Sequence, residues 1–340
     1  MSDLKTTKLH TYHTSKNAKF INFAGWSMPF SYEGTLLEHN RVRQTSGFFD
    51  VSHMGRLILD YHQIKEINSL ICSELESLNN TKALYTVFSS DEGNALDDVI
   101  FWKFQDELIL ICNASNTEKI KNHLLEHNIY FQDVTLSTSL IAVQGLNAIE
   151  LLSTTFDIPD KFSTKKMSHF SYARTGYTGE DGIEIMVDNE NVEELLRLLE
   201  SLEILPCGLG SRDTLRLEAS LPLYGFELSE KISPVEAGLK WTITNENDYL
   251  GKKVHDQQLL TGNHKVLKKF ILNVKNIART DTLCSAGEIN GVVTSGNISP
   301  VLGHPIGFAL FETKPDTDLA VFDIRGNLIE GKLLNKRFLS

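Results

Sequence analysis

Cysteine is scarce in this chain of 340 residues, and its cysteines are widely separated. No C-x-x-C pair occurs, which argues against a disulfide framework and against a cysteine-based zinc site. We therefore predict reduced, mostly buried thiols and no bound metal. The cysteines are Cys72, Cys112, Cys207 and Cys284.

Long apolar runs are also absent. The segment ELILIC at 107–112 is among the longest, whereas a helix that spans a bilayer needs about 20 apolar residues. The first residues, MSDLKTTKLHTYH, have neither a secretory apolar core nor the arginine-rich pattern of a transit peptide. We therefore predict a cytoplasmic protein that does not enter a membrane.

An excess of basic charge is missing as well. The chain has 33 lysines and arginines against 44 aspartates and glutamates, which gives a formal net charge of -11. Nonspecific binding to nucleic acid depends on a basic footprint. The charge balance therefore favours small molecules or a protein partner over nucleic acid.

The hydrophobic pattern alternates short strands with amphipathic helices, which indicates α/β or α+β layers in two or three domains. Helices are predicted at 63–73, 116–128, 146–155 and 190–203. From about residue 266 the pattern changes to short strands with frequent turns, which predicts a small antiparallel barrel or a jelly-roll-like module. The polar stretch 244–265 is predicted to be a connector that contains a short helix.

A glycine-rich hairpin at 173–185, ARTGYTGEDGIEI, leads into a predicted strand. Alternation along that strand places Glu184 on one face and Ile183 and Ile185 on the other. The glycines let a flat ligand approach the backbone closely. A carboxylate at this point can accept hydrogen bonds from a pair of donors on a heterocycle.

Arg212 lies in the first turn of the helix predicted from LGSRDTLRLEAS, where the helix dipole disfavours a cation. One interpretation is that an anionic or oxygen-rich ligand compensates. The other is that Asp213 and Glu218 pair with Arg212 and Arg216 in a structural network, and spacing alone leaves both open. The motif GLGSRD lacks the third glycine of a dinucleotide-binding fingerprint, so a Rossmann site is not predicted.

Two adjacent acids, Asp97 and Asp98, stand in a segment that begins as a turn and becomes a strand, so they point to opposite faces. Asp98 shares its face with Ile100 and Trp102, which predicts a desolvated carboxylate and a good proton acceptor. The alternative is that Asp97 ends the turn and Asp98 pairs with a distant cation.

The segment DVSHMGRLIL at 50–59 contains His53 and Met54. No second histidine lies at a metal-ligand spacing, so we interpret His53 as a structural residue whose nitrogens find local partners. The thioether of Met54 suits contact with an aromatic ligand, although most such methionines belong to a core.

Nine segments occur in an order that resembles the aminomethyltransferase, or T-protein, family of the glycine cleavage system over nearly the whole chain. FAGW together with SPVEAGLKW favours this family over its folate-binding relatives. The segments are FAGWSMPFSY, FDVSHMGRL, ALYTVFSSDEGNALDDVI, LICNAS, AVQG, RTGYTGEDGIEI, SRDTLRLEASLPLYG, SPVEAGLKW and GVVTSGNISPVLGHPIGFA.

The resemblance implies an α+β fold, a three-domain cloverleaf around a central folate site. Two domains are expected to be ferredoxin-like, and the C-terminal one is expected to be an antiparallel β-barrel or jelly-roll-like domain. The expected boundaries are 1–50 plus 140–243 for the discontinuous first folate-binding domain, 51–139 for the second ferredoxin-like domain, 244–265 for the connector and 266–340 for the barrel.

The resemblance also implies transfer of a methylene unit from the aminomethyl-dihydrolipoyl arm of H-protein to tetrahydrofolate, with release of ammonia. Asp98 matches the catalytic aspartate of the family, and Glu184 and Arg212 match its folate-binding residues. The other expected members of the pocket are Tyr85, Met54, Asn113 and Tyr177.

Two rival functions are considered beside this one. The first is a noncatalytic folate-binding protein of the same fold that acts in iron-sulfur cluster assembly, but its cysteine-containing K-G-C-Y-type segment is absent from the sequence. The second is the folate domain of a demethylating dehydrogenase, which lacks support because no flavin domain is recognised. Near the end of the chain, Phe338 is a candidate to replace a folate-contacting tyrosine of the family.

Overall fold

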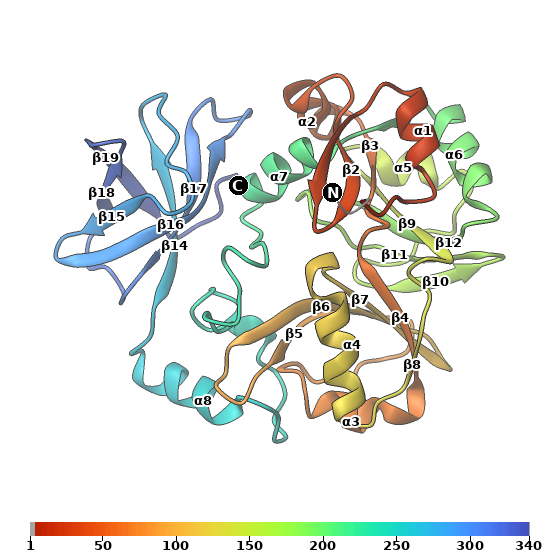
Figure 1. Ribbon diagram of the computed structural model, residues 1–340, viewed down its shortest axis with the longest axis horizontal. Helices are drawn as coiled ribbons and strands as arrows, with labels where there is room; N and C mark the ends of the chain where they lie inside the picture. The colour runs from red at the N-terminus through yellow and green to blue at the C-terminus, as the bar shows by residue number, and fades with distance from the viewer. Residues whose placement is uncertain (1–3, 340) are drawn as a thin grey trace. The chain divides into compact units, whose positions relative to one another are not determined.

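The computed structural model describes residues 4–339, which form mixed helices and sheets (Figure 1). The chain divides into two compact units. The first consists of the chain up to Ile67 together with Leu75–Thr86 and Val99–Asp213. The second consists of Asn68–Glu74, Val87–Asp98 and the chain from Thr214 onward.

The main sheet of the first unit has six strands in the order β10-β11-β12-β9-β3-β13. All neighbours are antiparallel except β3 and β13, which run parallel. The strands are β3 (Gly47–Asp50), β9 (Thr138–Gln144), β10 (Thr164–Met167), β11 (Phe170–Ala173), β12 (Gly182–Asp188) and β13 (Leu205–Pro206). Four elements precede the strands of this sheet in the sequence. They are α1 (His10–Ser15), the hairpin of β1 (Lys19–Phe23) and β2 (Trp26–Ser31), and α2 (Thr35–Gln44).

Helices α5 (Ala148–Leu152) and α6 (Val192–Ser201) pack on one face of this sheet. Their apolar residues form one core cluster with the strand residues Ile183 and Ile185. Because successive residues of a strand point to opposite faces, Glu184 lies on the face away from these helices. The face predicted for this carboxylate is therefore confirmed. Members from the helices are Ala148, Leu152, Val192, Leu195, Leu196 and Leu199.

A five-stranded sheet has the order β5-β6-β7-β4-β8. Both β5 and β6 pass from one unit into the other along their length. The strands are β4 (Gly55–Asp60), β5 (Ala83–Ser89), β6 (Ala95–Lys103), β7 (Glu107–Cys112) and β8 (Phe131–Asp133). The associated helices are α3 (Ile64–Asn68) and α4 (Thr117–Glu126), with the short 3-10 turns η1 (Tyr61–Gln63) and η2 (Ala114–Asn116).

The second unit ends in a closed barrel of six antiparallel strands, drawn in blue in Figure 1. Strand β14 pairs with both β17 and β19, and this double pairing closes the barrel. Phe270 and Phe322 meet inside it with ring centroids 4.5 Å apart. The strands are β14 (Val266–Leu272), β15 (Leu283–Ala286), β16 (Ile289–Ile298), β17 (Pro305–Phe311), β18 (Leu319–Ile324) and β19 (Asn327–Leu334). Before the barrel come α7 (Leu209–Glu218), η3 (Lys240–Thr242) and α8 (Lys252–Thr261).

The predicted α+β class and the C-terminal barrel are confirmed, and α8 is the short helix expected in the connector. The helix predicted at 63–73 is too long, because α3 ends at Asn68. Beyond it the backbone leaves the helix and pairs with β5, where the Cys72 amide donates to Val87 and the Ser89 amide donates to Leu70. The four domain boundaries predicted from the sequence stay a prediction.

All four cysteines are buried free thiols, as predicted. Burial raises the pKa of the Cys207 and Cys284 thiols to about 12. Within residues 4–339, none of the helices has the length and apolar character needed to cross a bilayer.

Candidate active site

Glu184 is buried on β12, with 5% of its surface exposed. The hydroxyl of Thr175 donates a hydrogen bond to its carboxylate at 2.6 Å. Thr175 belongs to the glycine-rich hairpin that precedes the strand. The hairpin therefore fixes one carboxylate oxygen and supports the carboxylate in a place where water has little access.

Arg212 lies in the first turn of α7, as the sequence predicts, and its guanidinium carbon lies 4.8 Å from the centre of the Tyr177 ring. Burial lowers the pKa of Arg212, while the charges of Glu184 and Tyr177 oppose that shift. The structure therefore brings three of the predicted site residues, Glu184, Arg212 and Tyr177, close enough to interact electrostatically. The Nη1 atom of Arg212 is buried and has no hydrogen-bond partner.

Arg216 lies in a structural network, although its partners Glu227 and Ser295 differ from the Asp213 and Glu218 of the alternative left open by the sequence. Its Nη1 donates to Glu227 at 3.0 Å in a buried ion pair, and its Nη2 donates to Ser295 at 3.0 Å. Glu218 accepts hydrogen bonds from the hydroxyl of Ser299 and the amide of Val301. Arg212 and Arg216 therefore have different environments despite their helical spacing.

The start of α7 is held by the fully buried carboxylate of Glu38 on α2. Its Oε2 accepts the amide of Gly208 at 2.7 Å, immediately before the helix that carries Arg212. Its Oε1 accepts three further amides, at 2.7 to 3.1 Å, from Tyr32, Glu33 and Gly34. One buried side chain thus ties α7 to the turn before α2. The contacts with Tyr32, Glu33 and Gly34 are local, but the sequence gives no signal for the contact with Gly208, which lies in a distant segment.

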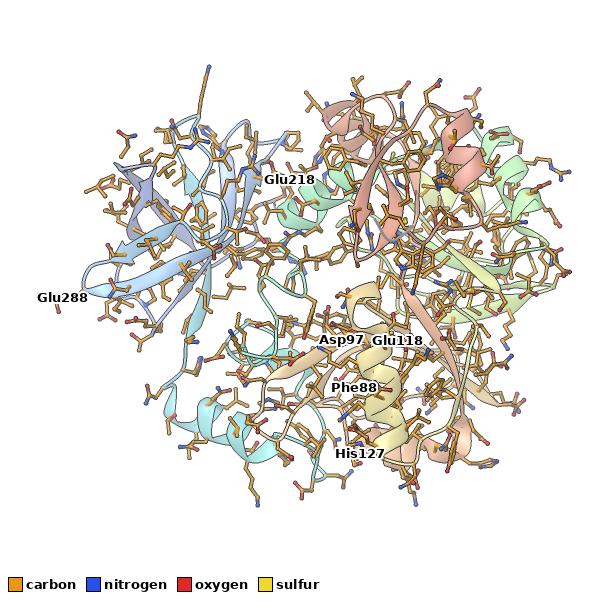
Figure 2. The ribbon with its side chains drawn as sticks, viewed as in Figure 1. Phe88, Asp97, Glu118, His127, Glu218 and Glu288 are labelled. Carbon is orange, nitrogen blue, oxygen red and sulfur yellow. The ribbon has the colours of Figure 1, made fainter. Side chains whose placement is uncertain are left out.

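The two adjacent acids of β6 differ in exposure, as strand alternation predicts. Asp97, labelled in Figure 2, is fully buried, and Asp98 is partly exposed. Asp98 is thus less enclosed than the sequence suggested, because β6 buries the face that carries Asp97, Val99 and Phe101 most deeply. The catalytic assignment of Asp98 stays a prediction.

Met54 lies in a tightly held loop between β3 and β4. The fully buried guanidinium of Arg56 donates to the carbonyls of Ser52, at 3.0 Å, and of Met54. The Met54 amide donates to the carbonyl of Val51 at 3.1 Å. The loop backbone is therefore fixed around a side chain that is itself partly exposed.

Asn113 and Tyr85 also belong to the first unit. Asn113 follows β7 and precedes the turn η2, and its carbonyl accepts the Asn116 amide at 2.9 Å. Tyr85 lies on β5, and both side chains are partly exposed. Their assignment to a ligand pocket stays a prediction.

His53 differs from the satisfied structural histidine that the sequence suggested. It is 5% exposed, yet its Nδ1 atom has no hydrogen-bond partner. The expectation that both ring nitrogens find local partners is therefore wrong at Nδ1, and the structural role of His53 stays a prediction.

Phe338 packs into an apolar cluster of the second unit. It is 8% exposed, and its ring centroid lies 6.1 Å from that of Phe308. Leu217 and Ile306 complete the buried part of the cluster. Its proposed replacement of a folate-contacting tyrosine stays a prediction.

Over residues 4–339 there is no group of three or more histidine, cysteine, aspartate or glutamate side chains arranged to hold a metal ion.

The four backbone amides that donate to the Glu38 carboxylate lead to a prediction about stability. Glu38→Gln replaces one acceptor oxygen by an amide donor. Either the Gly208 amide or the amides before α2 then lose their acceptor. We therefore expect the free energy of unfolding to fall by about 1–3 kcal/mol. The matched control is Glu33→Gln, which removes a surface ion pair with Arg41 and should cost no more than about 1 kcal/mol. Urea unfolding measures the free energy of unfolding of both variants. An equal loss in the two variants would contradict the stabilising role of Glu38.

Comparisons with known proteins agree on one family. The family model described as the GCVT N-terminal domain matches residues 9–247. An aminomethyltransferase of Synechocystis is 37% identical, with 98% of this chain and 95% of that protein aligned. An aminomethyltransferase of Thermotoga is 36% identical, with 98% of each chain aligned.

A solved structure agrees with these relatives. The crystal structure of the glycine cleavage system aminomethyltransferase T from Bartonella henselae matches with a TM-score of 0.91 and 25% identity, over 99% of this chain and 98% of that one. The expected family is therefore confirmed, and the chain belongs to the GCVT family as one of its aminomethyltransferase enzymes.

Proposed function

We propose that this enzyme moves the methylene carried as an aminomethyl group on the dihydrolipoyl arm of H-protein to tetrahydrofolate. The carbon–sulfur and carbon–nitrogen bonds of the aminomethyl group break, and two carbon–nitrogen bonds to the folate form. Ammonia and the reduced dihydrolipoyl arm leave, so the reaction needs no external oxidant or reductant. The cytoplasmic location predicted from the sequence is part of the same proposal.

The observation that carries this proposal is the buried Nη1 of Arg212, which has no partner although it belongs to a charged group. A buried donor without an acceptor is costly, so a ligand oxygen or nitrogen at this point would stabilise it. Glu184 offers a buried carboxylate for donors on the same ligand, and the Tyr177 ring supplies a flat apolar surface. These groups fit a pterin-like heterocycle with both donors and acceptors on its edge.

Tetrahydrofolate, when bound, supplies the nitrogen pair that accepts the one-carbon unit. Glu184 would hold donors of the heterocycle, and Arg212 would donate to an acceptor of it. Asp98 would take up a proton at its carboxylate and stabilise positive charge nearby. Such general acid–base assistance contributes about 10²- to 10⁴-fold to the rate.

The test of the reaction is ammonia release from H-protein loaded with the aminomethyl group, measured with and without tetrahydrofolate. We expect rapid release that needs both substrates and the enzyme. Tetrahydrofolate binding without any effect on ammonia release would instead support the noncatalytic folate-binding alternative.

The catalytic assignment predicts that Asp98→Asn lowers kcat by about 10²- to 10⁴-fold, because an amide cannot take up the proton. The affinity for tetrahydrofolate should change far less. The matched control is Asp91→Asn, at an exposed position in the turn before β6, which should keep full activity. Near-native turnover of purified Asp98→Asn enzyme would reject the assignment.

The binding assignment predicts that Glu184→Gln weakens tetrahydrofolate binding by about 10- to 100-fold, since a hydrogen bond to a charged group contributes roughly 1.5–3 kcal/mol. The control is Glu190→Gln, at an exposed position beyond the end of β12. Isothermal titration under anaerobic conditions measures both dissociation constants. An unchanged constant for Glu184→Gln would remove Glu184 from the binding site.

A further inference from the structure

The backbone on both sides of His53 is rigidly held. The Asp50 carboxylate accepts the Ser52 amide at 2.9 Å, and this carboxylate is also bound by His13 at 2.8 Å and by Thr7 at 2.7 Å. On the other side, Arg56 binds the carbonyls of the neighbouring residues, as described above. The backbone that carries His53 is therefore held in place on both sides of the residue.

The imidazole of His53 is buried without satisfying its polar atoms. Its ring meets Phe23 edge to face, with centroids 5.2 Å apart, and its Nδ1 atom has no hydrogen-bond partner. Leaving a buried polar atom unpaired is unfavourable, and most such atoms in folded proteins have a partner. The fold therefore leaves the Nδ1 atom of His53 available to pair with a ligand.

His53 is also a neutral ring in the electrostatic field of Arg212. The pKa of His53 is lowered to about 3, chiefly by burial, with the charges of Arg212 and Arg56 adding to the lowering and the charge of Asp50 opposing it. A neutral imidazole offers one donor and one acceptor nitrogen. The charge of Arg212 thus acts on His53, yet the Nη1 atom of Arg212 and the Nδ1 atom of His53 form no hydrogen bond with each other.

We propose that His53 is a further ligand-contacting residue of the site that contains Glu184, Arg212 and Tyr177. Its Nδ1 atom pairs with a polar edge of the flat heterocycle, beyond the part held by the carboxylate and the guanidinium. His53 is then a specificity-determining group, because a ring system without a polar atom at that edge leaves Nδ1 unpaired. This proposal rests on the proposed function, since it takes tetrahydrofolate as the ligand.

The experiment compares two variants of His53 with the wild-type enzyme and a control. His53→Phe keeps a flat ring without polar atoms and should weaken tetrahydrofolate binding by about 10- to 100-fold. His53→Asn keeps a short hydrogen-bonding group and should bind within about threefold of wild type. His10→Phe is the control, because His10 also has an unpaired Nδ1 and an aromatic neighbour, Phe20 with its ring centroid 4.8 Å away, but is not an expected residue of the ligand pocket.

Kinetics separate contact with the ligand from a merely structural role. Under the proposal His53→Phe raises KM for tetrahydrofolate and leaves kcat nearly unchanged, since uniform binding is lost and the reacting groups remain. Full tetrahydrofolate affinity in a folded His53→Phe enzyme would overturn the role of His53 alone. Absence of tetrahydrofolate binding by the wild-type enzyme would overturn the proposed function and this inference together.

A measurement on the wild-type enzyme avoids dependence on the folding of a variant. In protein labelled with nitrogen-15 at histidine, the His53 Nδ1 resonance is assigned by its absence from His53→Asn. Tetrahydrofolate should shift this resonance, because hydrogen bonding at the nitrogen changes its shielding, and should leave the His10 resonance in place. A His53 Nδ1 resonance that stays unchanged at saturating tetrahydrofolate would contradict the proposal.

Discussion

Two buried charged side chains organise the loops that carry the candidate site. Glu38 accepts the Gly208 amide and three other amides, and so positions the first turn of α7 with Arg212. Arg56 donates to the carbonyls on both sides of His53. Both charges are fully buried, and each is stabilised by several backbone dipoles. The site therefore depends on loops that are fixed through their backbones, which leaves side-chain atoms available for a ligand.

The sequence predicted most of the architecture because each element has a strong local pattern. The stripe of apolar residues in α6 and the alternation in β12 identify the helix face and the strand face that form one core. The barrel follows from short strands that alternate with turns. Prediction failed after Asn68, where an apolar run continues but tertiary pairing with β5 replaces the helix. Local periodicity cannot report a pairing that joins distant segments.

The site was predictable in part. The position of Arg212 early in a helix and of Glu184 on one strand face follows from spacing, and the cation–ring contact with Tyr177 unites the two motifs. The roles of Glu38, Arg56 and His53 were missed or misjudged, because a residue's hydrogen-bond satisfaction is a property of the folded chain. His53 shows this best, since its residue type favours a satisfied structural role and the structure leaves Nδ1 unpaired.

The central claim is that the carbon of the aminomethyl group passes to tetrahydrofolate on this enzyme. The most direct test loads H-protein with an aminomethyl group labelled with carbon-13 and follows the label by NMR. The account predicts that the label appears as the methylene bridge of the folate, in an amount equal to the ammonia released. Label that stays on H-protein, or that leaves as free formaldehyde at the same rate with and without tetrahydrofolate, would contradict it.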